Sequence, residues 1–211
     1  MKHDRLCVVD HPVVANMLTV LRDKNTSTFK FNSIVRLISV LEAYKVLENY
    51  ETHEIDVETV MCKTKGVELK TKGFVIVPIL RAGLAIADGL RMVLPYAEVG
   101  HLGMYRDPET HLPTTYYDKM PPNLLEKDII ITDPMLATGG SMCMAIDYFR
   151  NLGYKRKITC MVLVSVPEGL EKVLAYDNVC VYTCAVDKCL NDDKYIVPGL
   201  GDAGDRIYGT K

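Results

Sequence analysis

The stretch Asp128-Ile-Ile-Ile-Thr-Asp-Pro-Met-Leu-Ala-Thr-Gly-Gly-Ser141 decides the fold of this 211-residue chain. Its first five residues form a short apolar run that is typical of a buried strand, and the glycine-containing part leads into a helical segment that ends at about Leu152. Glycines let backbone N–H groups converge at the start of a helix, where the helix dipole favours an anion. The stretch therefore predicts a strand, an anion-binding loop and a helix in succession.

Two further strand–loop–helix units lie on either side of this one in the chain. The apolar run Phe74–Leu80 leads through Arg81-Ala-Gly83 into an apolar helix over Leu84–Leu94, and the run Lys157–Val164 precedes a short helix that begins at Pro167. Buried strands that alternate with helices favour a parallel sheet with helices on both faces and with ligands at the carboxyl ends of the strands. We therefore predict an α/β fold whose chemistry lies in these loops.

The residues before Phe74 carry two other patterns. Apolar residues at helical spacing predict two helices within residues 10–49, the first opening with an acidic cap at Asp10 and the second running from Phe31 to end near Asn49. Alternation with a period of two then predicts a protruding β-hairpin over about 53–73, with a turn at Lys65-Gly66.

Two polar stretches interrupt these patterns and are long enough to be functional loops. Tyr105–Tyr117 contains Arg106 and has the character of a lid that orders over an anion. In the second stretch, 187–211, prolines and glycines within Tyr195–Asp205 argue against regular structure and expose backbone groups that can read a flat heterocycle edge-on. The composition of neither stretch is that of a linker. We expect a single domain over 1–211 with a core at 74–185.

Composition and charge narrow the class of protein. The chain is 48 % hydrophobic and 25 % charged with a formal net charge of −2, which supplies a sizeable core and argues against a surface built for a polyanion. Asp4 and Asp10 interrupt the region where a signal peptide needs apolar residues, and no apolar run is long enough for a membrane span. Seven cysteines without CxxC pairs argue against a disulfide framework and a zinc site. We expect a cytoplasmic protein that binds neither nucleic acid nor membrane.

The loop Asp133–Ser141 has the character of a phosphate cradle that contains no lysine. The Walker A pattern fails for want of Gly-Lys-Ser/Thr, and the dinucleotide fingerprint fails on glycine spacing. The alternative is an ordinary strand-to-helix turn capped by Thr138. Asp133 favours a ligand, because a carboxylate at the end of a buried strand is uncommon without a partner, and the diol of a ribose beside a phosphate would be one.

Two arginines are candidates for a second anionic group. Arg81 stands at the carboxyl end of the strand 74–80, where a guanidinium suits bidentate binding of an oxyanion. A structural salt bridge is the alternative for this residue. Arg106 opens the first polar loop, although most arginines in such loops are simply solvated.

These motifs together resemble the uracil phosphoribosyltransferases, which belong to the type I phosphoribosyltransferase class. The resemblance covers essentially the whole chain and rests on four motifs: ILRAGL at 79–84, YRDPET at 105–110, DPMLATGGS at 133–141 and YIVPGLGDAGDR at 195–206. It implies transfer of the 5-phosphoribosyl group of 5-phosphoribosyl 1-diphosphate (PRPP) to uracil, with UMP and diphosphate as products. It also implies Mg²⁺ that arrives with PRPP and no metal site in the protein, and a homodimer or higher homo-oligomer. Some relatives respond to GTP, and the sequence leaves such an effector open.

The resemblance implies a role for each matching residue. Arg81 and Arg106 would contact the diphosphate and Asp202 would lie near the sugar and diphosphate, so these three are the expected catalytic residues. Uracil would bind against the backbones of Ile196, Gly201, Asp202 and Ala203, beneath a hood formed by residues of about 186–211. Pro134 stands where many members of the class carry a second acid, which excludes a general base or metal ligand there. Ribose and 5′-phosphate would be held by Asp133, Pro134, Met135, Leu136, Ala137, Thr138, Gly139, Gly140 and Ser141.

Two alternative functions remain at this point. A nucleotide-sensing RNA-binding regulator on the same fold would use the local basic cluster of Lys63, Lys65, Lys70 and Lys72, but the net charge argues against it. The predicted hairpin that carries these lysines fits a solvated arm or a subunit contact equally well. Another base such as hypoxanthine is the alternative within the class, and the segment 195–206 argues against it.

Overall fold

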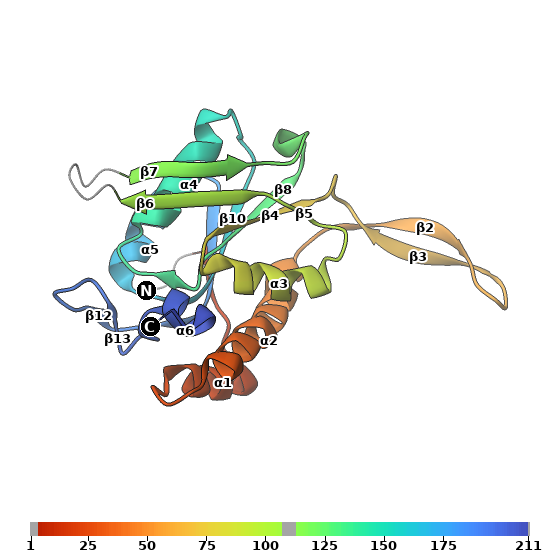
Figure 1. Cartoon of the computed structure of the whole chain (residues 1–211). Helices are drawn as coiled ribbons and strands as arrows, with labels where there is room; N and C mark the ends of the chain where they lie inside the picture. The colour runs from red at the N-terminus through yellow and green to blue at the C-terminus, as the bar shows by residue number, and fades with distance from the viewer. Residues whose placement is uncertain (1–3, 107–112, 211) are drawn as a thin grey trace.

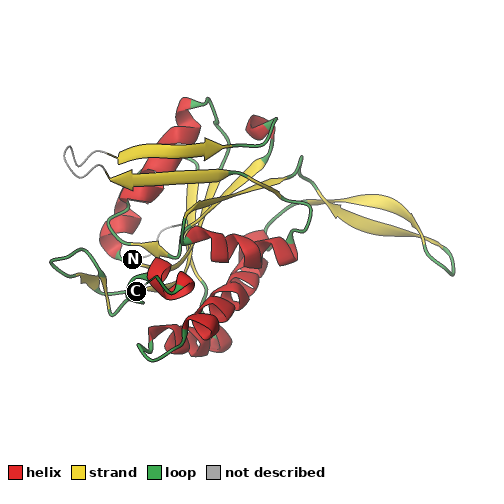
Figure 2. Ribbon diagram, in the orientation of Figure 1, coloured by secondary structure: helices red, strands yellow, loops and turns green. Residues whose placement is uncertain are grey.

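A mainly parallel central sheet lies between two layers of helices in the computed structural model, which describes residues 4–106 and 113–210 (Figures 1 and 2). The strands are parallel except for the antiparallel pair β6 and β7, and two short strands, β5 (Glu98–Val99) and β9 (Met135–Leu136), pair with β4 and β10. The predicted parallel sheet is thereby confirmed. Its order is β1 (Leu6–Val8), β11 (Val179–Val186), β10 (Ile158–Ser165), β8 (Asp128–Thr132), β4 (Phe74–Leu80), β6 (His101–Arg106) and β7 (Pro113–Lys119).

Apolar side chains on both faces of the sheet explain why both faces carry helices. Alternate residues of a strand point to opposite faces, so Ile130 joins the core beneath one helical layer while Ile129 and Ile131 join the other. The first layer contains α1 (Pro12–Arg22), α2 (Thr28–Leu47), α3 (Gly83–Val93) and α6 (Ala203–Tyr208). The second contains α4 (Gly140–Asn151) and α5 (Pro167–Leu174), and a short 3₁₀ helix spans Leu124–Glu126. Within the described ranges, no helix has the length and apolarity needed to cross a bilayer.

Strand register brings two of the predicted site loops to one edge of the sheet. Pro78 of β4 pairs with Thr132 of β8, and Met161 of β10 pairs with the same Thr132. The loop after β4 and the loop after β8 therefore leave neighbouring parallel strands at the same, carboxyl, edge.

The cap of the first helix lies one residue after the acidic cap predicted at Asp10. The capping residue is His11, whose Nδ1 accepts a hydrogen bond from the backbone N–H of Val13 at 3.2 Å, and Pro12 is the first helical residue. The N–H of the first helical residue has no partner within the helix, so proline, which lacks this N–H, is well suited to this position. The helix therefore starts at Pro12 whichever polar residue precedes it.

The predicted hairpin is present as β2 (Thr52–Glu58) and β3 (Lys63–Leu69), which form a separate two-stranded sheet that extends away from the body as an arm (Figure 1). The prediction of its turn at Lys65-Gly66 was wrong. The turn spans Thr59–Cys62, where the Thr59 N–H donates to the Cys62 carbonyl at 3.0 Å. Gly66 instead lies within β3, where a Cβ would stand 2.8 Å from Cγ2 of Val57, so this glycine makes room for a side chain of the opposite strand.

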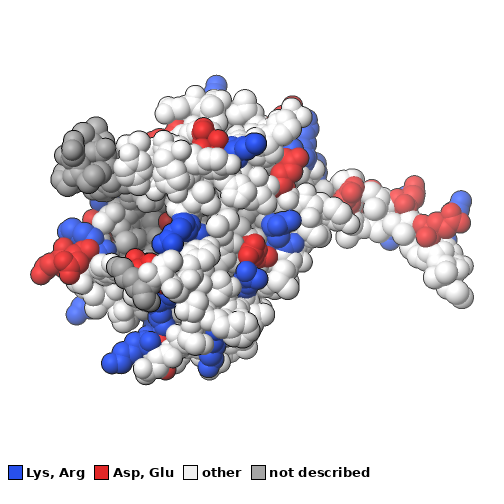
Figure 3. Space-filling model, viewed as in Figure 1, with Lys and Arg blue, Asp and Glu red and all other residues white. Residues whose placement is uncertain are grey.

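Three of the four lysines in the basic cluster of the arm are paired with acidic neighbours. Lys65 Nζ lies 2.5 Å from Asp56 Oδ1, Lys70 Nζ lies 3.0 Å from Glu51 Oε2, and Lys72 Nζ lies 2.9 Å from Glu126 Oε2. On the face shown in Figure 3, acidic side chains outnumber basic ones along the arm, and both kinds are interspersed over the body. The lysines therefore do not form the unopposed basic surface that an RNA-binding protein would present.

The predicted polar loop Tyr105–Tyr117 was wrong at its two ends. Tyr105 pairs with Thr114 and Gly103 with Tyr117 in the antiparallel ladder of β6 and β7, with a bulge between Gly103 and Met104. Threonine and tyrosine favour strands, but whether a polar stretch of them pairs depends on the partner strand, which composition does not reveal. The centre of the predicted lid, 107–112, lies outside the described residues, and the side chain of Arg106 lies outside them as well.

The C-terminal segment contains more regular structure than its glycines predict. A short antiparallel ladder joins β12 (Cys189–Leu190) to β13 (Ile196–Val197), and α6 follows. Asp202 caps this helix, since its Oδ1 accepts from the N–H of Asp205 at 2.9 Å, and Gly209 ends it with a left-handed backbone (φ +67°). Capping at both ends outweighs the weak helical preference of Gly204.

Candidate active site

Backbone contact joins the loop after β4 to the end of β8. Thr132 Oγ1 donates to the carbonyl of Gly83 at 2.9 Å. A Cβ on Gly83 would stand 2.2 Å from the carbonyl oxygen of Thr132, so only glycine permits this approach. The loop that carries Arg81 therefore lies directly beside the loop that begins at Asp133, as the strand order predicts.

The segment Asp133–Ser141, which we call the cradle, is held by β10 and turns sharply into α4. The N–H of Leu163 donates to the carbonyl of Pro134 at 3.1 Å. The N–H of Val166 donates to the carbonyl of Leu136 at 3.2 Å. Gly139 caps α4 with φ +80°, a left-handed conformation that glycine adopts without steric cost. The alternative in which Thr138 caps the helix was wrong, since Thr138 Oγ1 accepts only a long bond of 3.4 Å from the N–H of Gly140.

Asp133 places a partly buried carboxylate at the entrance of the cradle. Its Oδ1 accepts from the backbone N–H of Met135 at 3.3 Å. Burial raises the pKa of Asp133 to about 7, and this hydrogen bond partly opposes the increase. The carboxyl group therefore has hydrogen-bonding capacity for a ligand and a charge that depends on pH near neutrality.

Lys172 of α5 supplies the cation that the cradle sequence lacks. Its Nζ donates to the carbonyl of Thr138 at 3.1 Å and pairs with Glu168 Oε1 at 3.0 Å. Helix α5 can approach so closely because Gly169 faces Gly139, where a Cβ on Gly139 would lie 3.2 Å from the Gly169 carbonyl oxygen. Sequence reasoning missed Lys172 because it lies 34 positions from Thr138 on a different helix.

A pocket of about 610 Å³ opens beside the cradle. It combines small and hydroxyl-bearing residues of the cradle with two lysines, one from α5 and one from the segment between β12 and β13. Its size and charge suit a phosphorylated ligand. Its lining residues are Ala137, Thr138, Gly140, Ser141, Cys143, Met144, Glu168, Lys172 and Lys194.

Arg81 and Asp202 come together although they are far apart in the sequence. A Cβ on Gly204 would lie 3.3 Å from Asp202 Oδ1 and 3.9 Å from Arg81 Nη2. Arg81 Nη2 also lies 3.6 Å from Asp205 Oδ1, and the Tyr208 hydroxyl donates to the Arg81 carbonyl at 2.9 Å. The Arg81 side chain remains 56 % exposed, so the salt bridge to Asp205 leaves part of the guanidinium accessible to a ligand.

The residues predicted to hold uracil lie in the turn between β13 and α6. Ile196 is buried in the core and anchors the end of this turn, and Ala203 is buried at the first position of α6. Within residues 4–106 and 113–210, the backbone N–H groups of Gly201, Asp202 and Ala203 donate to no protein acceptor. Gly201 and Asp202 are exposed, so their donors are accessible to a ligand, as an edge-on reading of a base requires, whereas the donor of Ala203 is buried.

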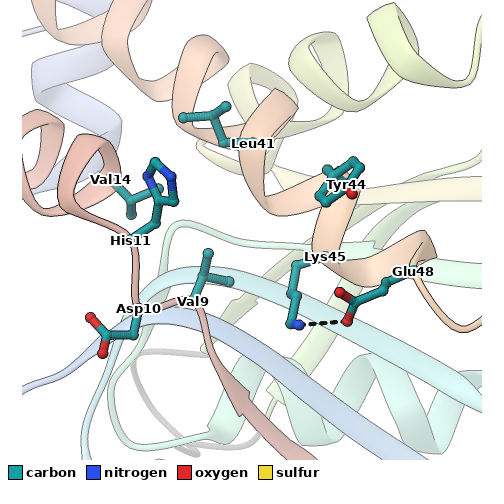
Figure 4. Close-up of a pocket in the computed structure, with 8 residues that line it drawn as sticks. All are labelled: Val9, Asp10, His11, Val14, Leu41, Tyr44, Lys45 and Glu48. Atoms are coloured by element: carbon teal, nitrogen blue, oxygen red, sulfur yellow. Dashed lines mark hydrogen bonds and ion pairs between the residues drawn. The ribbon is translucent and has the colours of Figure 1, made fainter.

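A different pocket, of about 310 Å³, lies between the start of α1 and the second half of α2 (Figure 4). It is lined by Val9, Asp10, His11, Val14, Leu41, Tyr44, Lys45 and Glu48. Lys45 is paired with Glu48 at 2.5 Å, and none of the predicted site residues reaches this pocket.

Solved structures define the class of protein to which this fold belongs. An adenine phosphoribosyl transferase from Trypanosoma brucei aligns with a TM-score of 0.57 at 10 % identity, over 90 % of this chain and 86 % of that one. The AQ2163 protein from Aquifex aeolicus aligns with a TM-score of 0.90 at 33 % identity, over 98 % of this chain and 99 % of that one. The fold is that of the type I phosphoribosyltransferases, as predicted.

Sequence comparison then identifies the branch of this class. The family model for uracil phosphoribosyltransferase matches residues 8–210. A uracil phosphoribosyltransferase of Dictyoglomus thermophilum is 50 % identical over 205 residues, which are 97 % of this chain and 99 % of that one. The chain belongs to the uracil phosphoribosyltransferase family, and the resemblance drawn from its motifs is confirmed.

Proposed function

We propose that this protein transfers the 5-phosphoribosyl group of PRPP to uracil, forming UMP and diphosphate. The observation that carries the proposal is the convergence of the cradle, Arg81 and Asp202 at one edge of the sheet, in a member of this family. The N1–C1′ bond forms as the bond from C1′ to the diphosphate oxygen breaks. The proton of uracil N1 is released, and the electron pair leaves with the diphosphate.

Positioning and charge stabilisation account for most of the proposed catalysis. Loss of diphosphate from an anomeric carbon passes through an oxocarbenium-like state, so the protein must hold the sugar and stabilise the negative charge of the leaving group. The accessible part of the Arg81 guanidinium suits the diphosphate, and Arg106 is assigned the same role by the family resemblance. The Asp133 carboxylate suits the ribose diol, and the cradle with Lys172 suits the 5′-phosphate.

The residues present fit a magnesium ion that arrives with PRPP. In the described part of the chain, no three His, Cys, Asp or Glu side chains are grouped to hold a metal by themselves. Magnesium prefers substrate phosphates and water with one or two carboxylates, and Asp202 offers an exposed carboxylate next to Arg81. When bound, the ion would neutralise charge on the diphosphate.

The activity is tested by diphosphate release from PRPP and Mg²⁺ by the purified protein. Uracil, hypoxanthine and no base are compared in parallel, and release that depends on uracil is expected. Release with hypoxanthine in place of uracil would leave the cradle assignment standing and contradict the assignment of the base. Absence of release with every base, together with salt-sensitive retention of RNA, would instead favour the regulator.

We further propose that the arm contacts a second copy of this chain. The apolar side chains of Val60 and Met61 are fully or almost fully exposed at its turn, and an isolated two-stranded hairpin has little stability of its own in water. Replacing both residues by Asp is therefore expected to shift a dimer or larger assembly towards the monomer. Phe29→Asp, which changes a similarly exposed residue at the start of α2, is the control.

Light scattering coupled to size-exclusion chromatography measures the mass of each variant. The expected result is a lower mass for the double Asp variant alone. An unchanged assembly would show that the turn of the arm makes no essential contact, and a monomeric parent protein would contradict the proposed association altogether.

A further inference from the structure

A largely buried ion pair joins Arg22, the last residue of α1, to Asp187, which directly follows β11. Nη1 and Nη2 of Arg22 lie 2.8 Å from Oδ2 and 2.6 Å from Oδ1 of Asp187, a residue that is 7 % exposed. Arg22 Nη1 also donates to the Gly199 carbonyl at 2.9 Å, and the Gly199 N–H donates to Asp187 Oδ2 at 2.9 Å. Each of the three residues is bonded to the other two. We call this arrangement the Arg22 clamp.

The Arg22 clamp connects the turn to the central sheet. The N–H of Asp187 donates to the Ser165 carbonyl of β10 at 2.7 Å, and the N–H of Lys188 donates to the Val197 carbonyl of β13 at 3.1 Å. The backbone of Asp187 is thereby bonded to β10, and its side chain is bonded to the turn at Gly199. Gly199 is two residues before Gly201, the first of the three N–H donors that have no acceptor among the described residues.

The same end of α1 holds the other side of the turn through Arg206 of α6. Arg206 Nη1 donates to the Leu200 carbonyl at 2.8 Å, and its Nη2 donates to the Asp23 carbonyl at 2.6 Å. Its guanidinium stacks 4.2 Å from the ring centroid of Phe31 in α2. The segment between Gly199 and Arg206, which contains the three donors, is therefore fixed at both ends to α1.

We propose that Arg22 and Asp187 are positioning residues for the base: they hold the donors of Gly201–Ala203 in the geometry that uracil requires, without touching it. The inference rests on the proposed binding of uracil by this segment. Rigid backbone donors distinguish and hold a ligand only when their positions vary by less than about 0.5 Å, and a buried bidentate pair supplies such a constraint. Removal of one partner leaves the other charge buried and unpaired, which displaces the turn.

The test is steady-state kinetics of Asp187→Asn, Arg22→Met and Arg22→Lys. For the first two, KM for uracil is expected to rise about tenfold, which corresponds to about 1.4 kcal/mol, while kcat and KM for PRPP change less than about twofold. Arg22→Lys keeps the charge but has one nitrogen where the clamp uses two, so a smaller rise is expected. A purely structural role would lower the amount of active protein and leave KM for uracil unchanged.

Two controls separate the possible results. Asp128→Asn breaks a partly buried ion pair away from the site, Asp128 Oδ1 to Arg156 Nη2 at 2.5 Å, at the amino end of β8, and is expected to leave KM for uracil unchanged. Gly201→Ala alters the proposed uracil site directly, since φ at this residue is +72°. Circular dichroism and thermal melting establish that each variant is folded.

An unchanged KM for uracil in folded clamp variants, with an increased KM in Gly201→Ala, would overturn the inference and leave the uracil site intact. An unchanged KM in Gly201→Ala as well would overturn the proposed uracil site itself. Should Asp187→Asn or Arg22→Met fail to fold, Arg22→Lys decides the question. An increase in its KM for uracil supports the clamp, and a parental value contradicts it.

Discussion

Cytosine is expected to react with PRPP about 10⁴-fold more slowly than uracil, measured as kcat/KM. Uracil presents a carbonyl oxygen at C4 and a donor at N3, whereas cytosine presents an amino group at C4 and an acceptor at N3. A backbone N–H of Gly201–Ala203 aimed at O4 would oppose the amino group of cytosine. Because the turn is held at both ends, the donor cannot rotate away, and a buried unpaired donor is costly.

Diphosphate release at saturating PRPP, with each base varied in turn, measures this ratio. The uracil reaction of the same preparation is the control for active enzyme. A ratio near unity would show that fixed backbone donors do not read the base. A ratio that falls in the Arg22→Lys variant would link this selectivity to the Arg22 clamp.

Asp133→Asn is expected to lower kcat/KM for PRPP by about 10²- to 10⁴-fold, because two hydrogen bonds from a ribose diol to a carboxylate contribute about 1.5–3 kcal/mol each. The parent protein should also gain kcat/KM as the pH rises through about 7, where the Asp133 carboxyl ionises. Asn cannot ionise, so the variant should lose this dependence. Kinetics between pH 6 and pH 8.5 measure both effects, with Glu171→Gln on the exposed face of α5 as control.

The same substitution should change stability in the opposite direction. Burial raises the native pKa of Asp133 above its unfolded value, so the native state holds this proton more tightly than the unfolded state. The resulting stability is present at low pH and is lost as the pH rises towards about 7. At pH 8 the Asn variant should therefore resist urea better than the parent protein.

For the activity prediction, an Asp133→Asn variant that keeps full kcat/KM for PRPP would exclude Asp133 from holding the ribose.

Local sequence patterns predicted most of the strands and helices, and they predicted which loops carry the candidate site residues. Phe74–Leu80 and Asp128–Thr132 are strands with the predicted bounds, and a helix begins at Pro167 as predicted. A short apolar run rich in β-branched residues and bounded by polar or glycine-containing segments is typical of a buried strand, so neighbouring residues suffice to identify it. The prediction of a turn at Lys65-Gly66 was wrong because glycine occurs in strands that pack closely as well as in turns. Only the position of the partner strand distinguishes the two cases.

The amino-acid sequence by itself determined the class of fold, the cradle and the family, because these depend on short contiguous motifs whose geometry is set by adjacent residues. Only the tertiary structure showed that Lys172 reaches the cradle and that Arg22, 165 positions from Asp187, holds the turn of the predicted uracil site. Lysine and arginine at the ends of helices are common on any surface. Their partners are chosen by the packing of α1 and α5 on the sheet, which no local pattern encodes.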